Sequence, residues 1–109
     1  MIEELLTDML YNMQDYLDKM YKSKNYDLET IKAGIINEWD CFIPYGGVHD
    51  LGLKIINSTT SVEELEYEID CLYSYVMSNI ETRDVKQSII DYRKKQLKKD
   101  FRKTKIKQV

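Results

Sequence analysis

The sequence predicts an all-α protein: a small antiparallel four-helix bundle-like domain with an irregular segment between its second and third helices. Apolar residues recur every three or four positions over long stretches, and residues typical of helix N-caps precede several of these stretches. At 109 residues, the chain is long enough to bury one modest hydrophobic core. We place the helical domain at residues 1–102 and expect residues 103–109 to form a basic, frayed tail.

The first helix is expected over residues 2–22. Its apolar side chains recur at helical spacing and fill one broad face: Ile2, Leu5, Leu6, Met9, Leu10, Met13, Tyr16, Leu17 and Met20. Acidic residues occupy its first turn and lysines its last, which suits the helix dipole. We interpret the methionines as core side chains that fill irregular gaps.

A second helix is expected over residues 28–39, with Asp27 as its N-cap. Gly34 lowers the intrinsic stability of this helix by up to ~1 kcal/mol, so the helix should depend on tertiary contacts. Pro44 and the glycine pair at 46–47 then mark a turn. Residues 48–57 fit either a short helix or a short strand, and their periodicity leaves both open.

The third helix begins after Ser61, where the stretch SVEE has the spacing of a capping box, and continues to about residue 80. The apolar pattern then changes phase. This change indicates a tight turn near residues 79–82 and a fourth helix capped by Thr82. The alternative is one continuous helix over residues 61–103, which would pair with a second copy in a homodimer.

If the chain turns, an antiparallel pairing of the last two helices aligns their apolar positions. Leu65 would face Leu97, Val62 would face Phe101, and Arg93 would reach towards the acidic residues Asp70 or Glu66. The same register sets Lys95, Lys98, Lys99 and Arg102 beside Glu68, Glu66, Glu64 and Glu63. We expect such exposed pairs to fix how the helices pack more than to stabilise them.

Charge is distributed unevenly along the chain. Residues 1–92 contain 7 basic and 18 acidic residues, whereas residues 93–109 contain 9 basic residues and 1 acidic residue. The net charge of −3 therefore conceals a dipolar molecule. The end of the chain has little apolar patterning, so we expect Lys103, Lys105 and Lys107 to be available to a polyanion such as nucleic acid.

The residue content favours neither catalysis nor a metal or cofactor site. His49 is the only histidine, and its spacing from Cys41 and from Asp40 or Asp50 matches no known site geometry. Two cysteines without a CxxC pair, an acidic N-terminus and no apolar run of membrane-span length indicate a cytoplasmic protein. Lys outnumbers Arg 13 to 3, which indicates AT-rich codons and a bacterial or phage origin.

Two surfaces are candidates for binding a protein partner. On the third helix, aromatic residues recur opposite the core face and carboxylates flank them: Tyr67 and Tyr75, with Cys71 between them, and Glu63, Glu64 and Glu68. The alternative is that this helix packs on both sides. The loop over residues 39–49 carries Trp39, Tyr45 and His49, which either bind a partner or plug the end of the bundle.

We therefore expect a non-enzymatic, acidic helical protein that binds a larger protein partner with a basic surface and inhibits or regulates it. By analogy of architecture alone, this is a role of the immunity-protein or phage-inhibitor type. The alternatives are a nucleic-acid-associated protein that uses the basic C-terminal helix and a homodimeric helical adaptor. No membrane partner is expected.

Overall fold

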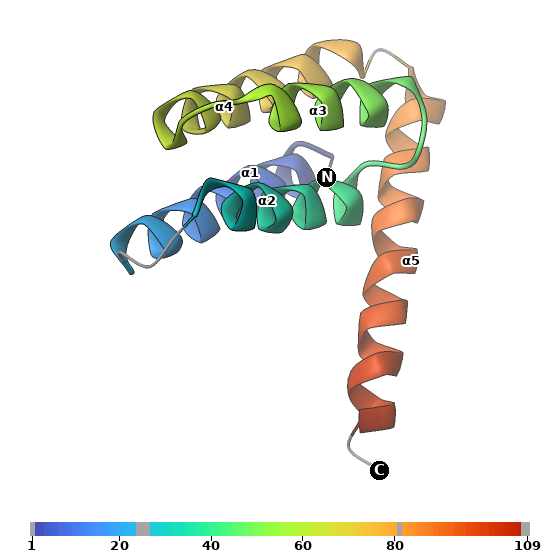
Figure 1. The fold of residues 1–109 in the computed structure, drawn as a ribbon. Coiled ribbons are helices and arrows are strands. Elements are labelled where there is room, and N and C mark those ends of the chain that lie inside the picture. The colour runs from blue at the N-terminus through green and yellow to red at the C-terminus, as the bar shows by residue number, and fades with distance from the viewer. Residues whose placement is uncertain (1, 24–26, 81, 108–109) are drawn as a thin grey trace.

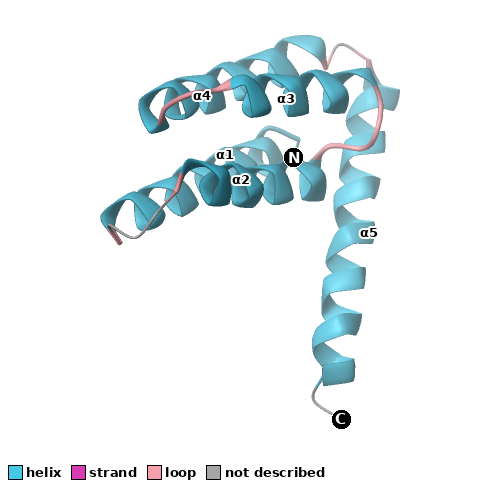
Figure 2. Cartoon of the chain, viewed as in Figure 1, coloured by secondary structure: helices cyan, strands magenta, loops and turns pink. Residues whose placement is uncertain are grey.

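Five helices make up the part of the chain that the computed structural model describes, which comprises residues 2–23, 27–80 and 82–107 (Figure 1). They are α1 (Ile2–Lys22), α2 (Leu28–Phe42), α3 (Gly47–Ser58), α4 (Val62–Asn79) and α5 (Arg83–Lys107). Side-chain environments are described as far as residue 99. Figure 2 shows helices and connecting loops, with no strand among the described residues, so the predicted all-α class is confirmed.

The first four helices form an antiparallel bundle around one core. α1 packs against α2 and α4, and α3 packs against the same two helices, so each of the four contacts two others within the bundle. In Figure 1 the α1–α2 and α3–α4 hairpins form two layers, and α5 crosses their end. The fully buried core side chains are apolar and come from all four helices: Leu6, Met9, Met13, Ile31, Ile35, Trp39, Ile56, Leu65, Ile69 and Leu72.

The first two predicted helices are confirmed. The Asp27 carboxylate caps α2 by accepting hydrogen bonds from the backbone N–H groups of Glu29 at 2.7 Å and Thr30 at 3.3 Å. α2 continues past residue 39 to Phe42, whose ring is buried. The longer helix brings this ring into the end of the bundle.

Gly34 lies where α1 and α2 approach closely. The Tyr16 ring of α1 packs across it, and a Cβ atom at this position would collide with that ring. The Tyr16 hydroxyl also donates a hydrogen bond to the Thr30 carbonyl oxygen at 3.3 Å. The residue that weakens α2 in isolation thus permits its packing against α1.

Residues 47–58 form a helix, which settles the choice between helix and strand. α3 occupies the fourth place in the bundle and buries Ile56. Its last turn is held by Lys32, a buried residue of α2, whose ammonium group donates to the Asn57 carbonyl oxygen at 3.1 Å and lies 3.7 Å from the Glu29 carboxylate. A cation at this end of a helix complements the helix dipole.

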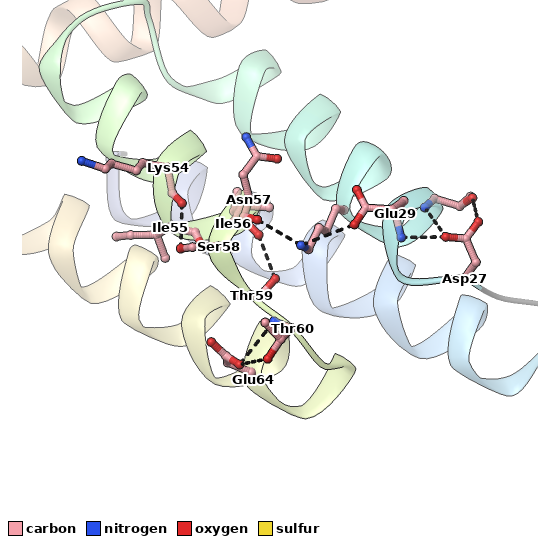
Figure 3. Close-up of polar contacts among 12 residues, drawn as sticks. Asp27, Glu29, Lys54, Ile55, Ile56, Asn57, Ser58, Thr59, Thr60 and Glu64 are labelled. Carbon is pink, nitrogen blue, oxygen red and sulfur yellow. Dashed lines mark hydrogen bonds and ion pairs between the residues drawn. The ribbon is translucent and has the colours of Figure 1, made fainter.

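The start of α4 has the predicted capping box with one difference. The Ser61 hydroxyl oxygen accepts a hydrogen bond from the Glu64 backbone N–H at 3.1 Å. The Glu64 carboxylate accepts from Thr60 rather than from Ser61, at 3.3 Å from its backbone N–H and 2.9 Å from its hydroxyl (Figure 3). Thr60 offers two donors to the carboxylate, so the returning bond lies one residue earlier than the motif predicts.

The chain turns between α4 and α5, as the phase change predicts. α4 ends at Asn79, whose side-chain amide donates to the Tyr75 carbonyl oxygen at 2.7 Å. The Thr82 hydroxyl oxygen accepts from the Val85 backbone N–H at 3.2 Å and caps α5. These contacts exclude the continuous helix over residues 61–103.

The predicted antiparallel pairing of α4 with α5 is wrong. α5 packs against α2 and α1, while α1 and α3 cover the buried face of α4. The Tyr92 hydroxyl donates to the Asp40 carbonyl oxygen at 2.8 Å, and the Arg93 guanidinium lies over the Phe42 ring, 4.1 Å from its centroid. Arg93 therefore stacks at the end of α2 instead of reaching the acidic residues of α4.

The reason is that residues 47–58 offer an apolar helix face that takes the place expected for the fourth helix. As a result, Leu97 is 49% exposed instead of facing Leu65. The lysines at positions 95, 98 and 99 are exposed and do not form the predicted pairs with α4 carboxylates. The side chains of Phe101 and Arg102 lie outside the described part of the structure.

α5 extends well beyond the bundle. Its second half points away from α1–α4 in Figure 1. The radius of gyration of 14.6 Å accordingly exceeds the ~13 Å expected for a compact chain of about this length. The helix continues to Lys107, past residue 103 where the frayed tail was expected to begin, although the side chains of Lys103, Lys105 and Lys107 lie outside the described part.

Candidate protein-binding surface

The outer face of α4, defined by Tyr67, Cys71 and Tyr75, is open to solvent. The Tyr67 side chain is 66% exposed and that of Tyr75 is 36% exposed, while Cys71 is half-buried. The opposite face of α4 buries Leu65, Ile69, Leu72 and Val76. α4 thus packs through one face, and its aromatic stripe lies outside the core.

Carboxylates surround this outer face. Glu63 and Glu64 are exposed and Glu68 is half-buried. The ion pairs among the described residues lie within α1, α2 and α3 and between α2 and α3, and none includes a carboxylate of α4. Because α5 packs elsewhere, its described basic residues up to Lys99 form no ion pair with the carboxylates of α4.

The pKa of the Tyr67 hydroxyl is raised. The largest cause of the raised pKa is its side-chain hydrogen bond with Cys71, followed by Coulombic interactions with Cys71 and with the nearby Glu68 carboxylate. A tyrosine phenol of ordinary pKa is already protonated at neutral pH, and the upward shift leaves the Tyr67 hydroxyl a hydrogen-bond donor. An exposed ring with such a donor is well suited to a protein interface.

A groove between α1 and α4 extends the acidic surface. Its volume is about 720 Å³, and the residues that line it are Tyr11, Gln14, Asp15, Leu17, Asp18, Tyr21, Val62, Glu63 and Glu66. We call this the acidic groove. The Gln14 side-chain amide donates to the Asp70 carboxylate at 2.8 Å and ties the two helices together beside it.

Exposed tyrosines and carboxylates give the acidic groove the same chemistry as the outer face of α4. Tyr11 is 66% exposed and Tyr21 is 49% exposed. Asp15 pairs with Lys19 at 2.9 Å and Asp18 with Lys22 at 3.0 Å, both along α1. Glu63 and Glu66 have no cationic partner within the described part of the chain.

The acidic groove was not predicted from the sequence. The sequence did contain an indication of it, because Tyr11 and Tyr21 lie outside the apolar face of the first helix and have acidic residues nearby. The sequence did not indicate that α1 packs beside α4, and the groove exists because these two helices are neighbours.

The loop over residues 39–49 is mainly structural. Trp39 and His49 are buried, at 0% and 2% exposure, so the prediction that they contact a partner is corrected. The Trp39 indole N–H donates to the His49 carbonyl oxygen at 3.1 Å, and His49 Nε2 lies within hydrogen-bonding distance of the Asp40 carboxylate. Large side chains that combine apolar area with polar atoms fill the end of the bundle here.

Tyr45 is the member of this loop that stays on the surface. Its side chain is 77% exposed, and its ring meets the His49 ring edge-on with 4.7 Å between centroids. Tyr45 also borders an apolar pocket of about 220 Å³ between this loop, the end of α4 and the start of α5. The pocket lies at the junction of three elements, apart from the acidic groove.

The described residues offer no cluster of three or more His, Cys, Asp or Glu side chains placed to hold a metal ion. His49 lies within hydrogen-bonding distance of the Asp40 carboxylate of α2 and 3.8 Å from the Asp50 carboxylate of its own helix. No helix in the described part of the chain is both long and apolar enough to cross a bilayer.

Comparison of the chain with protein-family models, with curated proteins and with solved structures finds no match. The surface itself is therefore the basis for a functional proposal.

Proposed function

We propose that this protein is a non-enzymatic binding protein that docks a basic surface of a larger protein partner onto α4 and the acidic groove, and thereby inhibits or regulates that partner. The observation that carries the proposal is the exposure of Tyr67 among α4 carboxylates that have no cationic partner within the described residues. Exposed aromatic side chains next to a field of one sign favour a partner of the opposite sign.

The carboxylates and the tyrosines of this surface would have different roles in binding. The carboxylates speed the encounter with a basic partner, an effect that salt screens. The tyrosines supply apolar area and hydrogen-bond donors once the surfaces meet, and such residues carry much of the energy at protein interfaces. The partner site would thus comprise Tyr11, Tyr21, Glu63, Glu64, Glu66, Tyr67, Glu68 and Tyr75.

Affinity capture from the native host, followed by titration with the purified partner, tests the proposal. The full-length wild type is compared with the double variant Tyr67→Ala/Tyr75→Ala and with the charge variant Glu63→Gln/Glu66→Gln. A matched charge control is Asp84→Asn/Asp91→Asn, which removes the same charge from exposed positions on α5.

The tyrosine variant should lose about tenfold or more in affinity while keeping its fold, since these side chains lie outside the core. The charge variant should associate more slowly and respond less to salt than the control. Wild-type affinity and association rate in both variants, or binding that does not change with salt, would contradict the proposal.

A further inference from the structure

The second half of α5 is separated from the acidic body. Two contacts join α5 to the end of α2: the hydrogen bond from Tyr92 to the Asp40 carbonyl oxygen and the stacking of Arg93 on the Phe42 ring. Beyond them, Lys94, Lys95 and residues 97–99 are exposed, and Gln96 is half-buried. Figure 1 shows this half of the helix leaving the body. From residue 94 to Lys107 it extends for about 20 Å at 1.5 Å per residue.

This projecting half carries a dense positive charge. Residues 94–107 contain eight basic residues and one acidic residue. Helical spacing places Lys94 above Lys98 and Lys95 above Lys99, which gives two adjacent rows of like charge. No ion pair involves these four lysines within the described part of the chain.

We propose that the second half of α5, residues 94–107, is an arm that binds the phosphate backbone of duplex DNA without reading its sequence. Like charges four residues apart destabilise a helix in isolation. Phosphates laid along the rows would remove that repulsion and release counterions, which favours binding. Lysine is a compact point charge that contacts phosphate without the planar, two-pronged geometry that arginine uses on base edges.

The acidic body does not prevent this contact. At physiological ionic strength, charges are screened over about 8 Å. The arm reaches about 20 Å beyond its last clear contacts with the bundle, so its outer turns lie beyond the range of most of the body's negative field. Had α5 packed along α4 in the register that the apolar pattern predicts, the same lysines would have faced carboxylates.

The dimensions favour duplex DNA over other polyanions. A helix with its side chains is about 10–12 Å across and enters the major groove of B-form DNA, which is about 12 Å wide. The major groove of an RNA duplex is too narrow for it. Residues 94–107 contain one aromatic residue, Phe101, which is too few to stack on successive unpaired bases. Their three apolar residues, Leu97, Phe101 and Ile106, are too few for the apolar face of an amphipathic membrane helix.

Fluorescence anisotropy of a short labelled DNA duplex of mixed sequence, titrated with full-length protein over a series of salt concentrations, tests the proposal. The arm variant is Lys94→Gln/Lys95→Gln/Lys98→Gln/Lys99→Gln. The control, Lys19→Gln/Lys22→Gln/Lys54→Gln/Lys86→Gln, removes the same total charge from α1, α3 and the first part of α5. Far-ultraviolet circular dichroism checks that both variants keep their helices.

The wild type should bind with an affinity that falls steeply with salt. The arm variant should lose about tenfold or more at low salt, and its log–log salt slope should become shallower by about 0.9 for each phosphate that it no longer neutralises. The control should retain most of the affinity and the wild-type slope.

Three results would overturn the proposal: no salt-dependent binding by the wild type, equal loss in the arm and control variants, or tighter binding to phosphatidylserine vesicles than to the duplex. Salt-sensitive self-association that the arm variant abolishes, in the absence of DNA binding, would also overturn it and would assign the arm to a second copy of the chain. None of these outcomes depends on the protein partner proposed above for α4.

Discussion

The Arg93 guanidinium of α5 lies over the Phe42 ring at the end of α2, with its central carbon 4.1 Å from the ring centroid. This contact and the hydrogen bond from Tyr92 to the Asp40 carbonyl oxygen set α5 across the end of the bundle. Two consequences follow: the acidic face of α4 stays open, and the basic half of α5 projects into solvent.

Replacing Arg93 with alanine should loosen this docking. Arg93→Ala removes the cation–π contact and should lower the free energy of unfolding by about 0.5–2 kcal/mol. The adjacent Lys94→Ala is the control, because Lys94 is exposed and should change stability by no more than about 0.5 kcal/mol. Urea denaturation measures both, and equal effects of the two variants would contradict the contact.

Gly52 should resist substitution because the Trp39 ring packs against it. A Cβ atom at Gly52 would collide with that ring, so Gly52→Ala should destabilise the protein by about 1–3 kcal/mol. Gly47→Ala is the matched control, since a Cβ atom there meets nothing within 4 Å. Trp39 is the single tryptophan, so its fluorescence during urea denaturation reports both stability and local packing. A neutral Gly52→Ala would show that α3 does not pack on this ring.

Lys32 should matter more than other lysines of the bundle. Lys32→Ala leaves the Asn57 carbonyl oxygen without its donor at the end of α3 and should cost about 1–3 kcal/mol. Lys54→Ala removes an exposed lysine of α3 and should change stability little. Comparable denaturation midpoints for the two variants would refute a role for Lys32 in holding α3.

Stability should depend on the charge of Asp27 in acid. The pKa of its carboxyl group is lowered from the ordinary 3.8, first by the hydrogen bond from the Thr30 side chain and then by the backbone N–H groups of Thr30 and Glu29. A carboxyl group whose pKa is lower in the folded state stabilises the fold above its ordinary pKa, and the effect disappears as pH falls through the lowered value.

Asp27→Asn isolates this effect, because the amide oxygen can still accept the capping hydrogen bonds but does not titrate. The wild type should be more stable than the variant at neutral pH, and the difference should shrink towards zero as the pH is lowered below 4. Urea denaturation of both proteins over this pH range gives the measurement. A difference that stays constant with pH would show that the charge of Asp27 does not contribute.

Local features of the fold could be predicted from the sequence. Asp27, Ser61 and Thr82 each cap the helix that they precede, because capping depends on a few neighbouring residues. The turn after α4 was likewise readable from a change in the apolar phase. These features depend on short stretches of chain, so they can be predicted without knowledge of the tertiary structure.

The choice of packing partners could not be predicted in the same way. The apolar positions of α4 matched those of α5 in one register, but α3 presents a competing face that buries Ile56. Which helix fills a place in a bundle depends on how all the faces fit together. The acidic groove was missed for the same reason, since Tyr11 and Glu66 become neighbours of one cavity only when α1 packs beside α4.

The distance between α4 and the projecting half of α5 tests the central claim most directly. Spin labels can be placed at the exposed positions Tyr67→Cys and Leu97→Cys in a Cys41→Ser/Cys71→Ser background, and pulsed electron paramagnetic resonance reports their separation. With α5 across the end of the bundle, the measured distances between the two labels should be much longer than the roughly 8–10 Å that separates the axes of packed helices. A short distance typical of neighbouring helices would show that α5 covers the acidic face of α4, and would contradict both the open surface and the free arm.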